Sequence, residues 1–254
     1  MMRRLRGFVD YLRVFSSVGD IRRFRRIAYG GGTDPVDVCV RQAGKRPMRI
    51  RPHTSDAAVL WDTFHEQFHL PPMKLRNKAV ILDLGANVGY TSAHFAHLYP
   101  GATVVAVELD RNNCAAAAVN LRSFPNCRLV NAAAWCEDGL VSYNPADEAW
   151  AFHITDGGCV STTVTATAKT IATLMRENGL TTIDYVKMDI EGAEWPVLSA
   201  GAEWLTKVAA LKIELHSKFN ANATFENCAH LLSAQGFQCT KDDRHWDTLV
   251  AVRY

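Results

Sequence analysis

Residues 79–92 constrain the fold of this chain more than any other stretch. They begin with Ala-Val-Ile-Leu, an apolar run without polar alternation, which is typical of a strand covered on both faces of a parallel sheet. Gly85 and Gly89 follow, and because neither carries a Cβ, the backbone can turn sharply there and approach a ligand. A helix beginning near Val88 would point its N-terminal amides at that ligand. The stretch therefore predicts an α/β protein with Asp83 at the carboxyl end of a strand, where open α/β sheets bind their ligands.

The residues of this turn also restrict the ligand. A dinucleotide-binding G-x-G-x-x-G turn has glycine at its second position so that the backbone can contact a pyrophosphate, but Asn87 stands there. Asp83 would repel a phosphate. S-adenosylmethionine, which carries an ammonium group and no phosphate, fits both residues better. Glu108 ends the next apolar run, and a carboxylate at the tip of a second strand can accept both ribose hydroxyls. The alternative is an ordinary glycine turn of an α/β protein.

Length and composition set loose limits. A chain of 254 residues can form one domain with extensions and bury a full core. Its net charge of +2 gives no argument for a nucleic-acid partner. Seven cysteines without a C-x-x-C pair indicate reduced thiols in a cytoplasmic protein, and no apolar run approaches the roughly 20 residues that span a bilayer.

The first 29 residues differ from the rest because they are strongly basic. They contain eight arginines and only two aspartates. Apolar residues recur among them at helical spacing, which predicts one amphipathic helix. Four interpretations remain open: a helix on an anionic membrane surface, a partner or dimer contact, a lid on the catalytic domain, or the solvated basic face of a packed helix. The apolar positions are Leu5, Phe8, Val9, Leu12 and Phe15.

The rest of the chain divides into a hairpin and an alternating α/β pattern. Extended pieces at 36–41 and 48–51, with Gly44 and Pro47 between them, predict a β-hairpin, so residues 1–52 form an N-terminal extension and 53–254 the main domain. Residues 137–168 are irregular and form either a substrate-facing insertion or a simple β-hairpin excursion. The expected helices lie at 54–67, 88–99, 111–122, 169–178 and 224–235, and the expected strands at 79–82, 102–108, 128–131, 183–188, 208–215, 237–240 and 249–254.

Acidic residues and a histidine gather at the ends of two of these strands. Asp189, Glu191 and Glu194 follow one strand, and Glu214 and His216 end the next. Because neighbouring parallel strands end side by side, Asp189 and Glu214 should project over the same crevice. Asp189, Glu214 and His216 could bind Mg²⁺ or Mn²⁺, or His216 could act as a general base with a pKa near neutrality. The alternative for Glu191 and Glu194 is that they only favour a helix N-terminus.

Three motifs together resemble the FkbM family of S-adenosylmethionine-dependent methyltransferases. They are Asp83-Leu-Gly-Ala-Asn-Val-Gly89, Val186-Lys-Met-Asp-Ile-Glu-Gly-Ala-Glu194 and Ile213-Glu-Leu-His216. The resemblance covers about residues 53–254. It implies the class I methyltransferase fold, a Rossmann-like, doubly wound, mostly parallel sheet of seven strands whose last strand is antiparallel. It also implies methyl transfer to oxygen, often of a sugar or a polyketide-type hydroxyl.

The resemblance assigns cofactor residues by matching position. It implies that the methionine part of the cofactor lies against Asp83, Gly85, Asn87 and Gly89, that Glu108 holds the ribose, and that Asn131 and Ala132 lie by the adenine. The chain departs from the family pattern after Glu108, where Leu-Asp-Arg-Asn replaces a proline-rich segment.

The sequence thus predicts an O-methyltransferase that acts on a hydroxyl of a small molecule, glycan or glycolipid, with Asp189, or a metal that it holds, and His216 removing the hydroxyl proton. An NAD-dependent oxidoreductase is disfavoured by Asn87 and Asp83. Two further alternatives are an inert binding or scaffold module that kept the fold, and a methyltransferase acting on nitrogen of a macromolecule. The N-P-P-Y-type loop of base methylases is absent after the fourth strand. The basic N-terminal helix could place the protein at the periphery of a membrane or mediate self-association.

Overall fold

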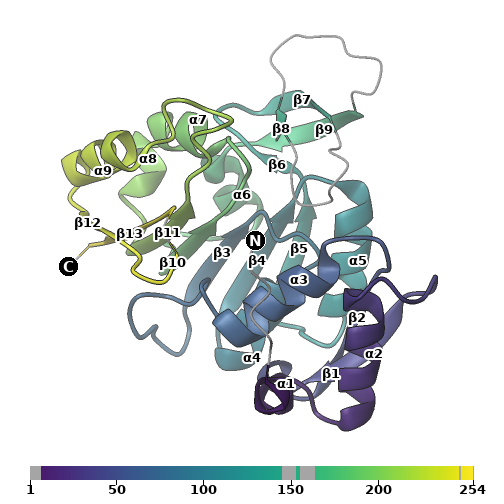
Figure 1. Ribbon diagram of the computed structural model, residues 1–254. Coiled ribbons are helices and arrows are strands. Elements are labelled where there is room, and N and C mark those ends of the chain that lie inside the picture. Colours follow the sequence, from purple (N-terminus) through teal and green to yellow (C-terminus); the bar gives the residue numbers. More distant parts are fainter. Residues whose placement is uncertain (1–6, 145–152, 155–163, 246, 254) are drawn as a thin grey trace.

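The computed structural model describes residues 7–144, 153–154, 164–245 and 247–253. Its centre is a seven-stranded sheet in the order β12-β13-β11-β10-β3-β4-β5 (Figure 1). All neighbouring pairs are parallel except those that involve β13, which runs antiparallel to both β11 and β12. The predicted seven-stranded sheet with an antiparallel last strand is therefore confirmed. The strands are β3 (Val80–Leu84), β4 (Thr103–Glu108), β5 (Cys127–Asn131), β10 (Tyr185–Met188), β11 (Ala210–Glu214), β12 (Gln238–Lys241) and β13 (Thr248–Val252).

The strand order places a crevice beside β3. From β3 the chain continues to β4 and β5 on one side, whereas β10 and β11 pair on the other side. The carboxyl ends of β3 and β10 lie level, because Met188 pairs with Leu84. Connections that leave a parallel sheet in opposite directions open a ligand site at this point.

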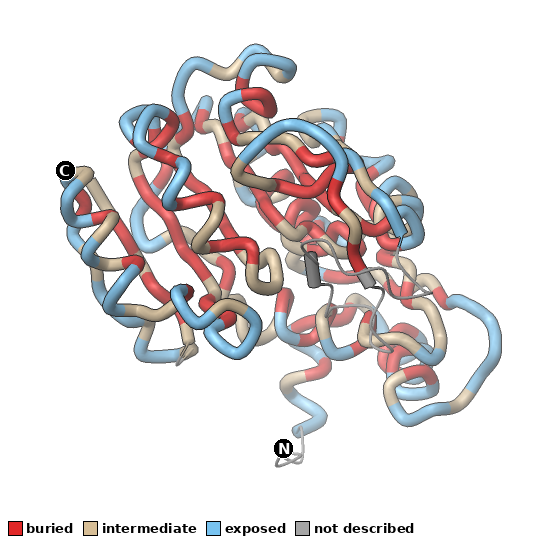
Figure 2. The backbone as a smooth tube through the Cα atoms, turned by 90° about the horizontal axis from the view of Figure 1, so that it is seen from above, coloured by how far each residue is buried: buried red, intermediate tan, exposed pale blue. Residues whose placement is uncertain are grey.

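Helices cover both faces of the sheet, as a doubly wound fold requires. Along β4, Val104 and Ala106 face one hydrophobic cluster and Val105 and Val107 face the other, so alternate side chains are buried on opposite faces. This explains why residues 104–107 of β4 form an unbroken apolar run in the sequence. Figure 2 shows these buried strands beneath partly exposed helices. One face carries α4 (Tyr90–Leu98) and α5 (Arg111–Leu121), and the other carries α6 (Ile171–Glu177), α7 (Glu194–Ser199), α8 (Ala202–Leu205) and α9 (Phe225–Ala234).

The N-terminal segment contains two helices and a hairpin, not one amphipathic helix. Helix α1 (Phe8–Val14) and helix α2 (Val18–Ala28) are separated because Phe15 has an extended backbone and pairs with Val40, and Ser17 then caps α2 by accepting from Asp20 N at 3.1 Å. The single-helix prediction is therefore wrong. The predicted apolar positions differ in burial, since Phe15 lies beyond the helix and is buried while Phe8, Val9 and Leu12 are exposed on α1; Leu5 lies outside the described residues.

The predicted hairpin is confirmed, with one change in its turn. Strands β1 (Val36–Val40) and β2 (Arg46–Ile50) are antiparallel and joined by the short 3₁₀ helix η1 (Arg41–Ala43). Gly44 is left-handed with φ 67°. Pro47 lies within β2 opposite Cys39, on a two-stranded sheet where a missing N–H costs little.

The extension packs against the helices of the main domain. Helix α3 (Asp56–Trp61) continues into the π-helical turn η2 (Asp62–Glu66), which ends at left-handed Gln67, close to the expected range of 54–67. Val38, Ile50 and Phe64 lie in the same hydrophobic cluster as Tyr90 of α4. The division of the chain at residue 52 stays a prediction.

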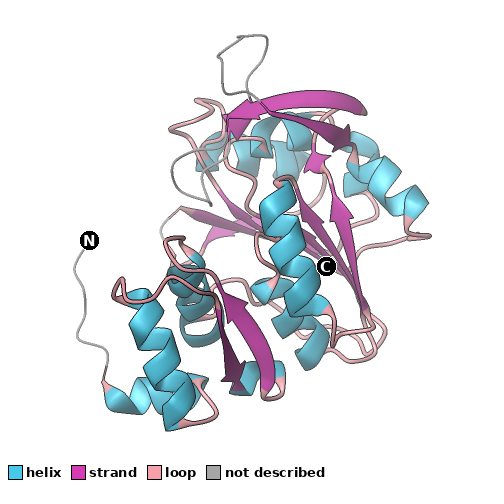
Figure 3. Cartoon of the chain, turned by 90° about the vertical axis from the view of Figure 1, so that its right-hand side faces the viewer, coloured by secondary structure: helices cyan, strands magenta, loops and turns pink. Residues whose placement is uncertain are grey.

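A second, smaller sheet lies at the opposite end from the N-terminal hairpin (Figure 3). Its order is β6-β9-β7-β8, and β7 and β9 pair antiparallel with Tyr143 opposite Val164. This agrees with the hairpin alternative for 137–168, although 145–152 and 155–163 lie outside the described residues. In the described part of the chain no helix is long and apolar enough to cross a membrane. The strands are β6 (Ala133–Ala134), β7 (Gly139–Asn144), β8 (His153–Ile154) and β9 (Val164–Lys169).

Candidate active site

The glycine turn after β3 has the backbone geometry that its sequence demands. Gly85, Asn87 and Gly89 all have positive φ, at 76°, 50° and 83°. A Cβ on Gly85 would lie 1.7 Å from the backbone oxygen of Asp189, so a side chain is impossible there. The turn after β3 is therefore in direct backbone contact with the acidic segment after β10.

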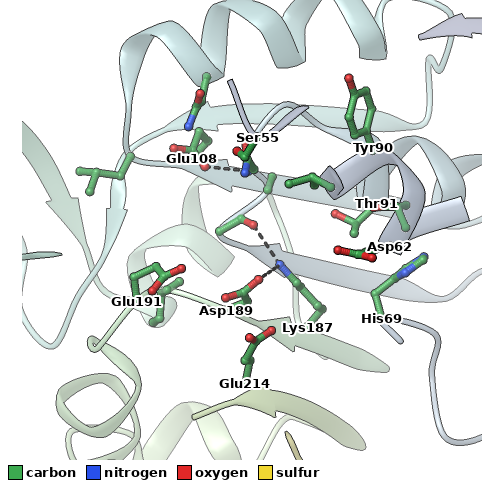
Figure 4. Close-up of a pocket in the computed structure, with 18 of the residues that line it drawn as sticks. Ser55, Asp62, His69, Tyr90, Thr91, Glu108, Lys187, Asp189, Glu191 and Glu214 are labelled. Carbon is green, nitrogen blue, oxygen red and sulfur yellow. Dashed lines mark hydrogen bonds and ion pairs between the residues drawn. The ribbon is translucent and has the colours of Figure 1, made fainter. Parts of the chain in front are cut away.

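A cavity of about 1000 Å³ opens over these two segments (Figure 4). Of the predicted cofactor residues, Gly85, Asn87, Glu108 and Ala132 line it. Asp189 and Glu214 line it as well, as expected from the neighbouring ends of β10 and β11. The cavity thus joins the predicted cofactor turn to two of the three predicted catalytic residues.

Asp83, Gly89 and Asn131 do not line the cavity but hold its walls in place. Asp83 is fully buried, and its Oδ2 accepts from Thr91 Oγ1 at 2.6 Å and Ser92 Oγ at 2.5 Å in the first turn of α4. Asn131 Nδ2 donates to the backbone oxygen of Glu108 at 2.8 Å. A Cβ on Gly89 would lie within 3.4 Å of α5, so this glycine permits close packing of the two helices.

Glu108 connects the glycine turn to the end of β4. Its Oε2 accepts from the backbone N of Asn87 at 2.7 Å, and its Oε1 accepts from the backbone N of Asp110 at 2.8 Å. Burial raises the pKa of Glu108 to about 7, against the effect of these hydrogen bonds. Each carboxylate oxygen can accept more than one hydrogen bond, so the ribose role expected for Glu108 is compatible with these contacts.

The acidic and histidine residues form one cluster at the ends of β10 and β11. His216 Nε2 lies 3.8 Å from Asp189 Oδ1, 3.8 Å from Glu214 Oε1 and 3.3 Å from Glu191 Oε2. One ligand atom each from Asp189, Glu214 and His216 lie within 4.8 Å of one another, which is compact enough to hold a metal ion. The structure therefore brings together all three residues of the predicted site.

Glu194 fixes the orientation of the imidazole. Its Oε1 lies 2.8 Å from His216 Nδ1, and the same carboxylate accepts from the backbone N of Gly192 at 3.0 Å. The expectation that Glu194 only favours a helix N-terminus therefore misses its contact with His216. A carboxylate that binds one ring nitrogen of a histidine in this way orients the other nitrogen toward a metal or a proton.

Negative charge dominates the electrostatics of this cluster. Burial lowers the pKa of His216, but the hydrogen bond with Glu194 and the charges of Asp189, Glu194 and Glu191 outweigh it and raise the pKa to about 9. This value differs from the near-neutral one expected from the sequence, because four carboxylates surround the ring. The charge of Asp189, together with burial, raises the pKa of Glu214. Burial and the same charge raise the pKa of Glu191 to about 7.

Lys187 is a functional residue that the sequence interpretation missed. Its Nζ donates to the backbone oxygen of Gly85 at 2.9 Å and to Asp189 Oδ2 at 3.2 Å, and lies 3.7 Å from Asp83 Oδ1 (Figure 4). Burial raises the pKa of Asp189, but the charge and hydrogen bond of Lys187 together with the charge of His216 outweigh it and lower that pKa below its ordinary value. The signal in the sequence was a lysine between the apolar residues of a central strand, because buried lysines are nearly always paired.

The other end of the cavity is formed by residues that no motif predicted. Asp62 and Val59 come from α3 and its π-helical continuation, and His69 lies just beyond them. His245, from the loop before β13, completes this wall and packs against Phe68 with ring centroids 5.0 Å apart. In Figure 4, Asp62 and His69 lie on the far side of Lys187 from Glu108, so the cavity has room beyond the cofactor turn.

The strand order, the glycine turn and the acidic strand tip define a class I S-adenosylmethionine-dependent methyltransferase. The family model of the methyltransferase FkbM domain matches residues 83–239, and the chain belongs to this family. The 2-O-methyltransferase NoeI of Sinorhizobium fredii is 26% identical over 151 residues, which are 53% of this chain and 62% of that protein. The chain thus matches less than two thirds of this relative.

Two solved structures resemble the chain distantly. A fibrillarin pre-rRNA processing protein of Methanococcus jannaschii has a TM-score of 0.45 and 15% identity, with 81% of this chain and 76% of that chain covered. An Aeropyrum pernix fibrillarin with natively bound S-adenosyl-L-methionine has a TM-score of 0.42 and 12% identity, with 70% and 68% covered. Because these TM-scores are low, the fold assignment depends on the strand order.

The residues present fit the cofactor that this family uses. The cavity is large enough for a nucleoside with a methionine tail, and its glycine turn lets backbone approach a ligand. Asn87 Oδ1 is buried and has no hydrogen-bond partner among the described residues, so it is available as an acceptor for the ammonium group. Glu108 lies beside it at the end of β4, where a ribose would be held.

Proposed function

We propose that this methyltransferase transfers the methyl group to a hydroxyl oxygen of a small molecule, glycan or glycolipid. The observation that carries the proposal is the compact cluster of Asp189, Glu214 and His216, of which Asp189 and Glu214 line the cavity between the cofactor turn and the α3 end. A hydroxyl must lose its proton to become a good nucleophile, and this cluster offers either a base or a metal site for that purpose. The distant relative named a 2-O-methyltransferase also supports oxygen as the acceptor.

The residues of the chain supply positioning and charge. The bound cofactor provides an activated methyl group on a cationic sulfur, so the protein chiefly has to align the acceptor oxygen with it. The glycine turn and Glu108 line the end of the cavity where the cofactor would bind. Lys187 keeps Asp189 ionised and holds it against Gly85, so that a carboxylate stands where the acceptor hydroxyl would enter.

The proton of the acceptor could be removed in two ways. Asp189, Glu214 and His216 would hold Mg²⁺ or Mn²⁺, which lowers the pKa of a hydroxyl that it binds. Without a metal, a group of the same cluster would take the proton directly. We favour the metal because two carboxylates and an oriented histidine are more than a base requires.

A methylation assay separates these versions. Loss of turnover in EDTA, with recovery in Mn²⁺ or Mg²⁺, supports the metal, whereas unchanged turnover in EDTA supports a base. Asp189→Ala and Glu214→Ala should both be inactive, while Glu203→Ala, which removes a carboxylate whose side chain is 85% exposed, should behave like the unaltered protein.

Two outcomes would favour the alternative functions. If the protein does not bind S-adenosylhomocysteine, the scaffold alternative is favoured. Methylation of amines but not of hydroxyls would favour the nitrogen alternative.

The location of the protein in the cytoplasm is part of the proposal. Cys39, Cys114, Cys127, Cys228 and Cys239 are free thiols, and reduced thiols are typical of cytoplasmic proteins.

A further inference from the structure

Helix α1 presents an apolar face to solvent. Phe8 is 57% exposed, Val9 62% and Leu12 39%. At about 100° per residue these positions fall on one side of the helix, so their side chains form one patch. A monomeric protein that exposes adjacent large apolar side chains usually uses them for binding.

Packing of the opposite face fixes this orientation. Tyr11 and Val14 are buried, and the Tyr11 ring meets Trp61 edge-on with centroids 5.2 Å apart. Arg41 Nε donates to the backbone oxygens of Leu12 at 3.0 Å and Phe15 at 2.9 Å. The end of α1 is therefore anchored to the hairpin, and its apolar side faces outward because its other side is occupied.

Arginines flank the apolar patch on both sides. Arg13 follows Val9 around the helix, with 71% of its side chain exposed. On the other side, the Arg25 guanidinium lies over the Tyr11 ring at 5.9 Å from its centroid. Arg22 and Arg26 of α2 are also exposed. In the described residues of α1 the sole acidic residue is Asp10, which pairs with Arg13 at 3.5 Å.

We propose that α1 and these arginines form a docking surface for an anionic lipid bilayer. Apolar side chains between arginines are the pattern of helices that lie in a lipid interface, where the apolar groups enter the acyl boundary and the guanidinium groups meet acidic headgroups. Three side chains are far short of the roughly 800 Å² per partner of a stable protein interface, so a second copy of the chain fits less well.

Docking in this way would place one end of the cavity near the lipid. This is the end that Val59, Asp62, His69 and His245 line, and we call it the acceptor end. The Nε2 atom of His65, in the π-helical turn that continues α3, lies 3.7 Å from Asp10 Oδ1 of α1, and Trp61 of α3 packs on Tyr11. The same α3 and π-helical segment lines the cavity through Val59 and Asp62. The docking itself does not depend on the methyl-transfer chemistry.

Vesicle co-sedimentation of the full chain tests the proposal. The protein should bind phosphatidylcholine vesicles that contain phosphatidylglycerol, and should bind pure phosphatidylcholine vesicles at least about tenfold more weakly. The triple variant Phe8→Ser, Val9→Ser, Leu12→Ser should lose at least about tenfold in vesicle affinity. Arg13→Gln and Arg25→Gln should each lose roughly fivefold, and binding should weaken in high salt.

A matched control is Leu140→Ser, which removes an apolar side chain that is 78% exposed on β7, at the opposite end of the molecule. It should bind vesicles like the unaltered chain. Binding of S-adenosylhomocysteine by each variant confirms that it is folded. Equal vesicle binding by the triple variant, or no binding by the unaltered chain, would overturn the proposal. The proposal would also be overturned if analytical ultracentrifugation showed the unaltered chain as a dimer and the triple variant as a monomer, since a second copy would then cover the patch.

Discussion

The two ends of the cavity are built in different ways. The cofactor end consists of backbone and buried side chains that hold one another, with Glu108 bound to two backbone amides and Gly85 against the backbone of Asp189. The acceptor end consists of side chains from α3 and from the loop before β13, which lie outside the segment that matches the family model. We therefore expect the cofactor end to tolerate almost no substitution and the acceptor end to tolerate more.

The largest effect is expected from Gly85→Ala. The new Cβ would lie 1.7 Å from the Asp189 backbone oxygen, so the turn and the acidic segment must separate. We expect loss of S-adenosylhomocysteine binding in calorimetry. The control is Gly179→Ala, which has a similar φ of 66° but open space around its Cβ, and should cost only about 1 kcal/mol of stability. Similar behaviour of the two variants would mean that the contact with Asp189 is unimportant.

Lys187→Met should be the next most damaging change. It leaves the buried carboxylate of Asp83 and that of Asp189 without their cation, and breaking a buried ion pair typically costs about 3–5 kcal/mol. Urea unfolding should show this loss. Lys207→Met is a suitable control, because its ion pair with Glu203 is exposed and should contribute less than about 1 kcal/mol. A loss for Lys187→Met no larger than for the control would contradict the role given to Lys187.

A pair of variants separates the two ends functionally. Glu108→Gln should weaken the binding of S-adenosylhomocysteine by roughly one to two decades in affinity and leave the KM for the acceptor unchanged. Asp62→Asn should do the reverse, raising the acceptor KM by about tenfold or less. Because the pKa of Glu108 is about 7, cofactor affinity should fall as the pH drops below 7, and Glu108→Gln should abolish that dependence. Equal effects of both variants on cofactor affinity would argue against two separate ends.

The last prediction concerns two buried histidines, His69 in the wall of the acceptor end and His94 next to it. His69 Nε2 lies 3.0 Å from His94 Nδ1, and burial lowers the pKa of His94 to about 4. The unfolded chain takes up this proton near pH 6.5, while the native protein does so only near 4. Stability should therefore fall by about 2 kcal/mol from pH 7 to pH 5 through this group. Denaturant midpoints of His94→Gln should show a shallower pH dependence, and an unchanged slope would exclude this cause.

Sequence predicted the cofactor end better than the acceptor end for a physical reason. A glycine that needs positive φ and a strand that needs two apolar faces are local demands, so Gly85 and β3 could be read directly from the sequence. Whether Asp83 faces the cavity or the first turn of α4 depends on packing between distant segments. The same holds for Asp62 and His245, which reach the cavity only after the extension and the last strands assemble.

The N-terminal segment shows the same limit. Helical spacing of apolar residues predicted a helix, but tertiary packing decided that Tyr11 is buried and Phe8 is exposed. The pairing of Phe15 with Val40 ends the first helix and Ser17 caps the second, and helical spacing alone does not predict this break.

The most direct test of the central claim is to locate the transferred methyl group. Purified protein is incubated with S-adenosylmethionine that carries an isotopically labelled methyl group and with a panel of hydroxylated acceptors, and products are fragmented by mass spectrometry. The account predicts label on oxygen, and loss of product by a factor of about 10² or more in Asp189→Ala with little change in S-adenosylhomocysteine affinity. Label on nitrogen, or full activity in both Asp189→Ala and His216→Ala, would contradict it.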